Sequence, residues 1–444
     1  MSPIAHTRAA APPVERAIVQ PARVGGHGSR LAIAFGLLLA VALLLRLGFI
    51  AVTADYVPAH DDRRYARLAC SIAVAGQYSL RTPDTTRAGC GAMPRGANEP
   101  TAFRPPGYSF FLAGVLAAGP LIPGDFWTDG RVVNAVLGTL VVALVGVIAL
   151  QVWGRRIAIA AVALAAVDMP LILVGGSLLS ETLFVTLVLA AVAVALRSRT
   201  ARRRTRWAAA AGVLVGLAAL TRPTGLVLLV PLGLAAATRP RRPSAAIALV
   251  VAAVVTIAPW TIRNAVQMRA FIPVADQLGS WLAGTYNEQA RRDPVHPAAS
   301  QVRVREFRPL DRLDEAPRQR ELTRRALAYA ADHPDYVPEV LLHNTLRMLN
   351  LEGAGWWRAQ GESIGMPRWA ADAGAYVFWA LVVLALLGAL TAGARRAPPW
   401  LWLVPLLLFG AVIVAGSEIR YRAPVEPFIV LLAALAIHSP RERA

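Results

Sequence analysis

Apolar residues occur in long blocks along the chain, separated by short polar segments rich in arginine. Most blocks approach the roughly 20 residues that an α-helix needs to cross the hydrocarbon core of a bilayer. A helix satisfies its backbone hydrogen bonds by itself in lipid, so these blocks predict spanning helices. Ten spans are predicted, the fifth and sixth being short: residues 31–53, 131–153, 157–174, 178–196, 207–220, 225–237, 245–262, 373–392, 400–415 and 424–437.

Arginines in the short loops predict the orientation, because cytoplasmic loops of membrane proteins carry an excess of basic residues. If ten helices alternate, the arginines of residues 1–30, 197–206 and 439–444 all fall on one side, which is predicted to be cytoplasmic. Residues 108–122 are apolar but short and bounded by prolines, and counting them as a span would place the basic clusters outside. We therefore assign them to the first outer loop as a juxtamembrane or re-entrant helix.

This topology predicts an all-α polytopic protein of the cell (inner) membrane, with juxtamembrane helices in a long first outer loop. Its chemistry is predicted to face the extracytoplasmic side. The predicted segments are a disordered cytoplasmic N-terminus (1–30), a transmembrane module (31–262) with the first outer loop (54–130), an outer polar segment (263–372), C-terminal transmembrane helices (373–438) and a cytoplasmic tail (439–444).

Composition supports the membrane assignment. The 444 residues are 56% hydrophobic with a mean hydropathy of +0.49, which is too apolar for an ordinary soluble domain. The net charge is +19, and all 46 basic residues are arginines. Because the arginine clusters lie between apolar blocks, we interpret them as topology signals and lipid headgroup contacts, and no nucleic acid partner is expected.

Acidic, basic and aromatic side chains gather in the predicted outer turns. They are Asp61, Asp62, Tyr65, Arg104, Glu181, Arg222, Arg263, Asn264, Glu418, Arg420, Tyr421 and Arg422. Arginine in a short outer turn opposes the usual charge distribution, and its planar guanidinium matches the geometry of a phosphate. A bound anion therefore explains these arginines, and the alternative is headgroup contact or structural pairing, as between Arg420 and Glu418.

The carboxylates have two interpretations as well. A carboxylate at a helix end near the membrane is costly unless it is paired or used. Asp61 and Glu181 are candidates for a general base or for a divalent cation site. For Asp62 we favour an ion pair with Arg63, Arg64 or Arg104.

Two cysteines, Cys70 and Cys90, fall in the first outer loop. Thiols on the oxidising face of a membrane are expected to pair, which predicts a disulfide across this loop. Reduced cysteines that only pack are the alternative.

The order of several short motifs resembles the polyprenol-dependent GT-C glycosyltransferases, in particular the family 39-like group. That group includes the protein O-mannosyltransferases and the bacterial enzyme that transfers aminoarabinose to lipid A. The motifs are DDRRYA at 61–66, AFRPPGY at 102–108, LSETLF at 179–184, GLAALTRP at 216–223, PWTIRN at 259–264, AY at 328–329 with HP at 333–334, and RYRAP at 420–424. The first motif of the family usually reads Asp-Glu, so the second acidic position, Asp62, departs from the pattern.

The resemblance implies a glycosyltransferase that moves a hexose or pentose from polyprenyl phosphate to an acceptor hydroxyl, with inversion at the anomeric carbon. Asp61 would be the catalytic base, while Asp62 and Glu181 would serve the acceptor or a metal. The implied ligands of the donor phosphate are Arg104, Arg222, Arg263, Arg420 and Arg422, supported by Tyr65, Asn264, Glu418 and Tyr421. The expected partners are the lipid-linked sugar donor, a lipid, glycan or protein acceptor, and membrane lipids. A divalent metal (Mg, Mn or Zn) is an open expectation, because some relatives use one and others do not.

Two other functions fit outer arginines. A transporter or flippase of a lipid-linked sugar would carry ionisable residues near the middle of its spans, where this chain has few. A cell-envelope polysaccharide ligase or polymerase would lack the acidic motif after the first span.

The topology predicts the location of a reporter fused after Gly130. A phosphatase reporter at this position should be active, because Gly130 is predicted to be extracytoplasmic, and a fluorescent reporter that folds only in the cytoplasm should be dark. The same reporters fused after Arg156 should give the opposite result. Cytoplasmic signal after Gly130 would contradict the ten-span topology.

Overall fold

The structure is a computed structural model that describes residues 27–79, 85–92, 99–237, 243–300, 304–362 and 366–438. The predicted disordered residues 1–26 and the predicted tail 439–444 lie outside the described residues. The described part is almost entirely helical. Its single sheet pairs the antiparallel strands β1 (Thr85–Thr86) and β2 (Gly89–Cys90) in the first outer loop.

Each of the ten predicted spans corresponds to helix in the structure. These helices are α1 (His27–Val52), α4 (Phe126–Val152), α5 (Arg155–Val167) with α6 (Met169–Gly175), α7 (Glu181–Thr200), α8 (Arg204–Thr221), η1 (Pro223–Leu228) with α9 (Leu229–Ala237), α10 (Ser244–Met268), α16 (Arg368–Ala389), α18 (Pro399–Ile413) and α19 (Glu426–His438). Five of them are long and apolar enough to cross a membrane, or six if α5 and α6 form one bent span. The protein is therefore a multi-pass membrane protein, and the number ten stays a prediction.

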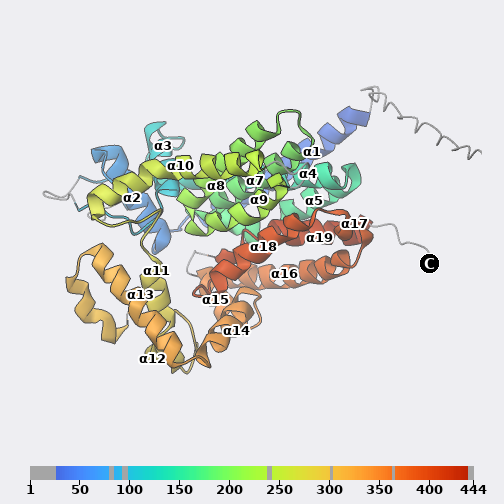
Figure 1. Ribbon diagram of the computed structural model, residues 1–444. Coiled ribbons are helices and arrows are strands. Elements are labelled where there is room, and N and C mark those ends of the chain that lie inside the picture. Colours follow the sequence, from blue (N-terminus) through green and yellow to red (C-terminus); the bar gives the residue numbers. More distant parts are fainter. Residues whose placement is uncertain are drawn as a thin grey trace, which may run out of the picture.

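The remaining helices lie in loops. They are α2 (Asp61–Ala75), α3 (Pro106–Ala117), α11 (Leu278–Thr285), α12 (Glu288–Arg291), η2 (Arg305–Arg312), α13 (Glu315–Asp332), α14 (Tyr336–Met348), α15 (Ala354–Glu362), α17 (Ala392–Arg396) and η3 (Ile419–Arg422). The 12 residues of α3 extend only about 18 Å at the usual helical rise, which is too short to cross a bilayer core. Figure 1 shows α2, α3 and α11–α13 at one end of the bundle, and the start of α1 and the end of α19 at the other.

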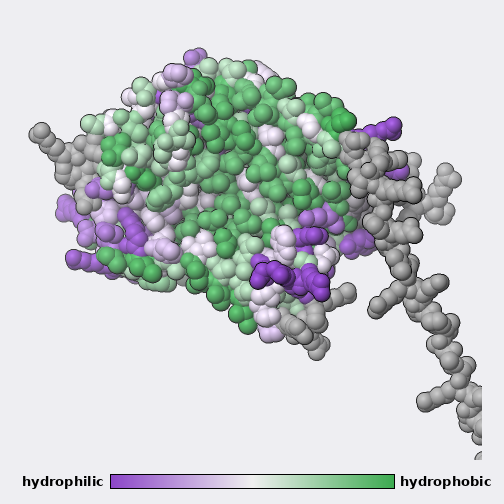
Figure 2. Space-filling view, turned by 90° about the horizontal axis from the view of Figure 1, so that it is seen from above, coloured by the Kyte–Doolittle hydropathy of each residue, from purple (hydrophilic) through white to green (hydrophobic). Residues whose placement is uncertain are grey.

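The surface of the bundle matches a lipid environment. Large apolar side chains such as Leu37, Val255, Leu386 and Leu406 are exposed. Figure 2 shows hydrophobic residues across the middle of one face, with hydrophilic residues gathered toward its ends. In a lipid bilayer such a surface needs no covering by protein, whereas in water it would be a large uncovered apolar patch.

The predicted span 157–174 is not a straight helix. The chain bends by 61° between α5 and α6, where Asp168 leaves the helical conformation. Pro170 lies in the first turn of α6, and Asp168 caps this turn by accepting a hydrogen bond from the Leu171 N–H at 3.5 Å. Proline suits the first turn of a new helix and disrupts the middle of an existing one, so the break follows from the local sequence. The bend places Pro170, Leu173 and Val174 in the wall of the cavity described below.

Close contact between α16 and α19 depends on Gly388. A Cβ atom at Gly388 would lie 1.8 Å from the Leu432 carbonyl oxygen, so any side chain would push the two helices apart. Gly388→Ala should therefore lower the thermal unfolding midpoint in detergent, because overpacking of a core costs about 1–3 kcal/mol. Gly410→Ala in α18 is the matched control, since nothing lies within 4 Å of its added Cβ. Equal unfolding midpoints for the two variants would contradict this packing.

Candidate active site

The first acidic residue of the outer loop, Asp61, begins α2 and is bound by two arginines from distant parts of the chain. Arg420 in η3 donates from Nη2 to Asp61 Oδ2 at 2.6 Å. Arg104, just before α3, donates from Nη2 to Asp61 Oδ1. All three side chains are largely buried. Tertiary folding thus brings the start of α2, the loop before α3 and the turn before α19 to one point.

Two arginines hold Asp61 as an anion. Burial raises the pKa of its carboxyl, but the positive charges of Arg420 and Arg104 lower it by more, and the net pKa lies well below the ordinary value. Both carboxylate oxygens are also occupied as hydrogen-bond acceptors. In this arrangement the carboxylate has little affinity for a proton.

Asp62 has a different environment from its neighbour. It accepts hydrogen bonds from the Tyr56 hydroxyl and from the backbone N–H groups of Ala59 at 3.1 Å, His60 at 2.7 Å and Arg63 at 2.8 Å. The ion pair that we favoured from sequence is therefore wrong, because backbone donors at the start of α2 and one hydroxyl bind this carboxylate instead. Asp62 fixes the start of the helix that carries Asp61.

Glu181 forms a second ion pair beside the first. It begins α7, is 1% exposed, and forms an ion pair with Arg222, whose Nη1 lies 2.8 Å from its Oε1. Arg420 Nε lies 3.6 Å from the same Glu181 oxygen, so Arg420 lies between Glu181 and Asp61. Arg222 also donates to the Ser180 hydroxyl at 3.3 Å.

Aromatic rings line this ion-pair group. The Tyr421 ring lies under both Arg222 and Arg420, whose guanidinium carbons are 4.9 and 5.2 Å from its centroid. Tyr65 donates to the Ser180 hydroxyl at 3.3 Å. Arg420 also pairs with Glu418, the more exposed acid of the group. Stacking of arginine on tyrosine restricts the guanidinium groups and adds favourable electrostatic contact.

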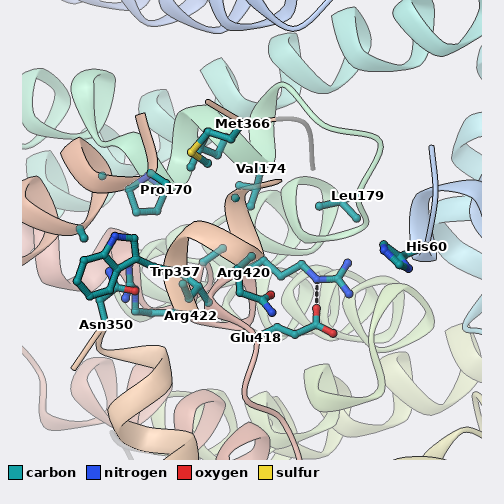
Figure 3. Close-up of a pocket in the computed structure, with 18 of the residues that line it drawn as sticks. His60, Pro170, Val174, Leu179, Asn350, Trp357, Met366, Glu418, Arg420 and Arg422 are labelled. Atoms are coloured by element: carbon teal, nitrogen blue, oxygen red, sulfur yellow. Dashed lines mark hydrogen bonds and ion pairs between the residues drawn. The ribbon is translucent and has the colours of Figure 1, made fainter. Parts of the chain in front are cut away.

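A cavity of about 290 Å³ opens beside Arg420. His60, Asp61, Glu418 and Arg420 belong to its polar lining, together with Asn350, Gln360 and Arg422, and most of the other lining residues are apolar. The apolar lining includes Pro170, Leu173, Val174, Trp357, Met366 and Ile419. Figure 3 shows His60 at one end of the cavity and Trp357 with Asn350 at the other, with the Arg420–Glu418 ion pair between them. An apolar chamber with a cationic group at one end suits a ligand that has both an apolar and an anionic part.

The remaining predicted arginines do not join the Asp61 group. Arg422 lines the cavity, but its guanidinium pairs with Glu426, donates to the Met348 carbonyl and lies 3.4 Å from the centre of the Phe378 ring. Its predicted role as a phosphate ligand would require these contacts to be exchanged.

Arg263 supports the loop before α3. It donates to the Thr101 carbonyl at 2.7 Å and to the Tyr78 carbonyl at 3.0 Å. Its neighbour Asn264 donates to the Ile272 carbonyl at 3.0 Å. These contacts are structural, so the geometry does not support the prediction that Arg263 binds phosphate and Asn264 assists it.

Sequence motifs did not reveal how the outer polar segment supports Arg104. Gln277 accepts from Arg104 Nη1 at 3.0 Å, and Glu315 accepts from the Thr101 hydroxyl at 2.6 Å and from the Ala102 N–H at 2.7 Å. We term these contacts, together with those of Arg263, the outer clamp. Gln277 and Glu315 lie outside the recognised motifs, and a single glutamine or glutamate in a polar segment gives no sequence signal.

A disulfide joins Cys70 in α2 to Cys90 in β2. It ties the small β-hairpin to the helix that begins with Asp61. Cys70 is fully buried beside Phe126, so the bond lies between the outer loop and the start of α4.

The acidic residues do not fit a divalent metal in the described structure. Among the described residues, no group of three or more metal-ligating side chains lies close enough to hold an ion. Both oxygens of Asp61 face arginine, and Asp62 faces hydrogen-bond donors. We therefore derive no chemical step through a metal.

Comparisons with known proteins bear on the fold of the chain. Residues 104–262 match the family described as dolichyl-phosphate-mannose-protein mannosyltransferase. A structure of the archaeal oligosaccharyltransferase AglB from Archaeoglobus fulgidus, in complex with an inhibitory peptide and a dolichol-phosphate, is similar with a TM-score of 0.54 and 15% identity, over 92% of this chain and 50% of that chain. The apo form of the oligosaccharyltransferase from the same organism gives a TM-score of 0.52 and 14% identity over the same shares. The chain has the GT-C fold.

The predicted GT-C architecture is thus confirmed. ArnT from Cupriavidus metallidurans bound to undecaprenyl phosphate is a weaker match, with a TM-score of 0.44 and 15% identity over 93% of this chain and 78% of that chain. No curated protein matches the sequence. This GT-C chain spans about half the length of the archaeal oligosaccharyltransferase.

The stability of the fold should depend on pH through Asp276, which lies near Glu315 of the outer clamp. Burial and the nearby Glu315 raise the pKa of Asp276 to about 6, against the opposing effect of Arg320. Because this pKa is higher in the folded state than in the unfolded chain, ionisation of Asp276 destabilises the fold above about pH 6 and has no effect below about pH 4. Asp276→Asn should therefore raise the thermal unfolding midpoint at about pH 7.5, and the gain should vanish as the pH falls to about 4.

The control for this prediction is Asp332→Asn at the exposed end of α13. Its unfolding midpoint should follow that of the parent protein at both pH values. A gain for Asp276→Asn that is equal at both pH values would show that ionisation of Asp276 is not the cause.

Proposed function

We propose that this protein is a membrane glycosyltransferase that moves a sugar from a polyprenyl-phosphate donor to an acceptor hydroxyl on the extracytoplasmic side. The observation that carries the proposal is the joining of an apolar cavity to an ion-paired acidic and guanidinium group around Asp61 and Arg420. The GT-C fold supports the same reaction class, and the similar archaeal oligosaccharyltransferase structure contains a dolichol-phosphate.

The two ends of the cavity suit the two parts of the donor. The apolar lining around Pro170, Trp357 and Met366 would contact the first isoprene units, while the rest of the lipid chain extends into the bilayer. Arg420 at the polar end would bind the phosphate, because a guanidinium presents paired N–H donors that match phosphate oxygens. The sugar would then lie near His60 and Asp61.

The chemistry follows from this placement. The acceptor oxygen forms a bond to the anomeric carbon as the bond from that carbon to the phosphate oxygen breaks, and the electron pair leaves on the phosphate. The proton of the acceptor hydroxyl passes to Asp61. Lipid phosphate is a stable anion, so positive charge from Arg420 assists its departure without a general acid. Attack opposite the leaving group inverts the anomeric centre.

The proposal also places the reaction on the extracytoplasmic side of the membrane, where the acceptor would approach. The group around Asp61 lies at the end of the bundle where α2, α3 and α11–α13 gather, which is the predicted extracytoplasmic end (Figure 1). A lipid, glycan or protein hydroxyl approaching from outside would reach this end directly. Transport of a lipid-linked sugar receives no comparable support from a specific contact.

Asp61→Asn tests the proposal. Purified parent protein, incubated with radiolabelled polyprenyl-phosphate sugars and membrane extract, should give a labelled product with at least one sugar. The variant should transfer about 10²–10⁴-fold more slowly, because an amide cannot accept the proton.

Asp332→Asn is the control and should transfer at the parent rate. Size-exclusion profiles in detergent should show that both variants fold. Full transfer by Asp61→Asn would eliminate Asp61 as the base, and failure of the parent protein with every donor would count against the enzyme class.

A further inference from the structure

The group that would act as base is not ready to accept a proton. Arg104 occupies Oδ1 of Asp61, and Arg420 occupies Oδ2. A general base needs a lone pair directed at the proton and a proton affinity suited to the working pH. In the described structure each oxygen of Asp61 is bound by an arginine, and the two positive charges lower its proton affinity, so displacement of one arginine would make it a better base.

The two arginines differ in how they are held. Arg104 is fixed from the outer polar segment, because Gln277 accepts from its second terminal nitrogen and the outer clamp holds the preceding residues Thr101 and Ala102. Arg420 instead lines the cavity and shares its guanidinium among Asp61, Glu418 and Glu181. A ligand in the cavity can therefore reach Arg420 and draw it away from Asp61, while Arg104 stays in place.

The charges make this exchange favourable. The ion-paired group contains three carboxylates and three guanidinium groups, those of Asp61, Glu181, Glu418, Arg104, Arg222 and Arg420. Arg64 adds a positive charge near Asp61, and the imidazole of His60 lines the same end of the cavity. The donor is a phosphodiester of the sugar and the lipid, so its phosphate brings one negative charge, and its two non-bridging oxygens match the paired N–H donors of a guanidinium. This phosphate would compete directly with Asp61 for Arg420, and both of these side chains are largely buried, which strengthens the electrostatic interaction.

We propose that the donor phosphate takes Arg420 from Asp61 and so turns Asp61 into the general base, while Arg104, oriented by Gln277, keeps the carboxylate in place. This inference rests on the proposed function, since it requires a lipid phosphate in the cavity. The freed Oδ2 accepts the proton of the acceptor hydroxyl as the new glycosidic bond forms. When the lipid phosphate leaves, Arg420 returns to Asp61 and the proton passes to water.

Because donor binding releases Asp61 from Arg420, the donor must bind before Asp61 can act as an effective base. Before the donor binds, the two arginines hold Asp61 as an anion of low proton affinity, so an acceptor or water molecule that enters first meets only a weak base. Donor binding removes one positive charge from the carboxylate and adds negative charge beside it, and both changes raise its affinity for a proton. Arg104 and Gln277 act as positioning residues in this scheme, because they act through Asp61.

The protonation of Asp61 can be observed directly by infrared spectroscopy. Full-length protein in lipid nanodiscs is titrated with acid, with and without undecaprenyl phosphate, and the protonated carboxyl band of Asp61 is identified by its loss in Asp61→Asn. With saturating undecaprenyl phosphate the midpoint of this band should lie at least about one pH unit higher than without it, which is a tenfold change in proton affinity. Lipid binding is followed separately by tryptophan fluorescence.

The variant Arg420→Gln tests the same inference without added lipid. Without undecaprenyl phosphate the midpoint of the Asp61 band should lie at higher pH in the variant than in the parent protein, because one of the two positive charges is gone. Arg395→Gln at the opposite end of the bundle is the matched control and should behave as the parent protein. An unchanged Asp61 band in Arg420→Gln overturns the inference whether or not the lipid binds.

The two proposals fail in different ways. If undecaprenyl phosphate binds but leaves the Asp61 band unchanged, the inference is wrong and the proposed function stands. If undecaprenyl phosphate does not bind the parent protein, the proposed donor site is wrong, and the Arg420→Gln arm still decides whether Arg420 controls Asp61.

Gln277 gives the test of positioning. Gln277→Leu should lower kcat about tenfold with the KM for the donor unchanged, because Arg104 loses the acceptor that orients it. Gln277→Glu should restore kcat, since it still accepts from Arg104. A rise in donor KM without a fall in kcat, or no rescue by glutamate, would contradict the positioning role.

Discussion

The site depends on the pairing of charges that are removed from water. Asp61 and Glu181 begin two different helices, and Arg104, Arg222 and Arg420 come from three separate loops. Each charge alone would be costly at this depth, and removing one partner of a buried pair typically costs about 3–5 kcal/mol. The requirement that each charge meet its partner therefore fixes how α2, α7, the α8–η1 turn and η3 meet at one end of the bundle.

The outer polar segment supports the ion-paired group by binding Arg104 and the residues before it. Gln277 accepts a hydrogen bond from Arg104, and Glu315 accepts from Thr101 and Ala102, which precede Arg104. Arg263 in α10 donates to the backbone carbonyl of Thr101 in the same loop. Arg104 connects these side chains to Asp61, because it donates to both Gln277 and Asp61. The outer segment thus helps to fix the position of the ion-paired group.

The bend between α5 and α6 shapes the apolar part of the cavity wall. A straight helix through residues 157–174 would have continued past the cavity, whereas the break at Asp168 turns Pro170, Leu173 and Val174 into its wall. The apolar lining therefore meets Arg420 within one cavity. A lipid-linked anion needs both environments within one molecular length, and this cavity supplies them.

The sequence by itself determined the helical membrane architecture and the residues that carry charge in the outer turns. Blocks of apolar residues have one stable form in lipid, so the pattern along the chain predicted a helical structure for each block. The helices α5 and α6 show that a proline can divide a block that reads as one span. The sequence also marked Asp61, Glu181, Arg222 and Arg420, because charged residues at the ends of apolar helices are rare without a reason.

Only the tertiary structure decided which of those charges meet. Asp61 and Arg420 are separated by 359 positions, and their contact depends on the packing of helices that the local pattern does not specify. The same packing assigned Asp62 to the start of α2 and Arg263 to the outer clamp, and it brought in Gln277, which no motif contains. The sequence determined the helices because their backbone bonding is local, whereas the site depended on tertiary structure because its contacts are long-range.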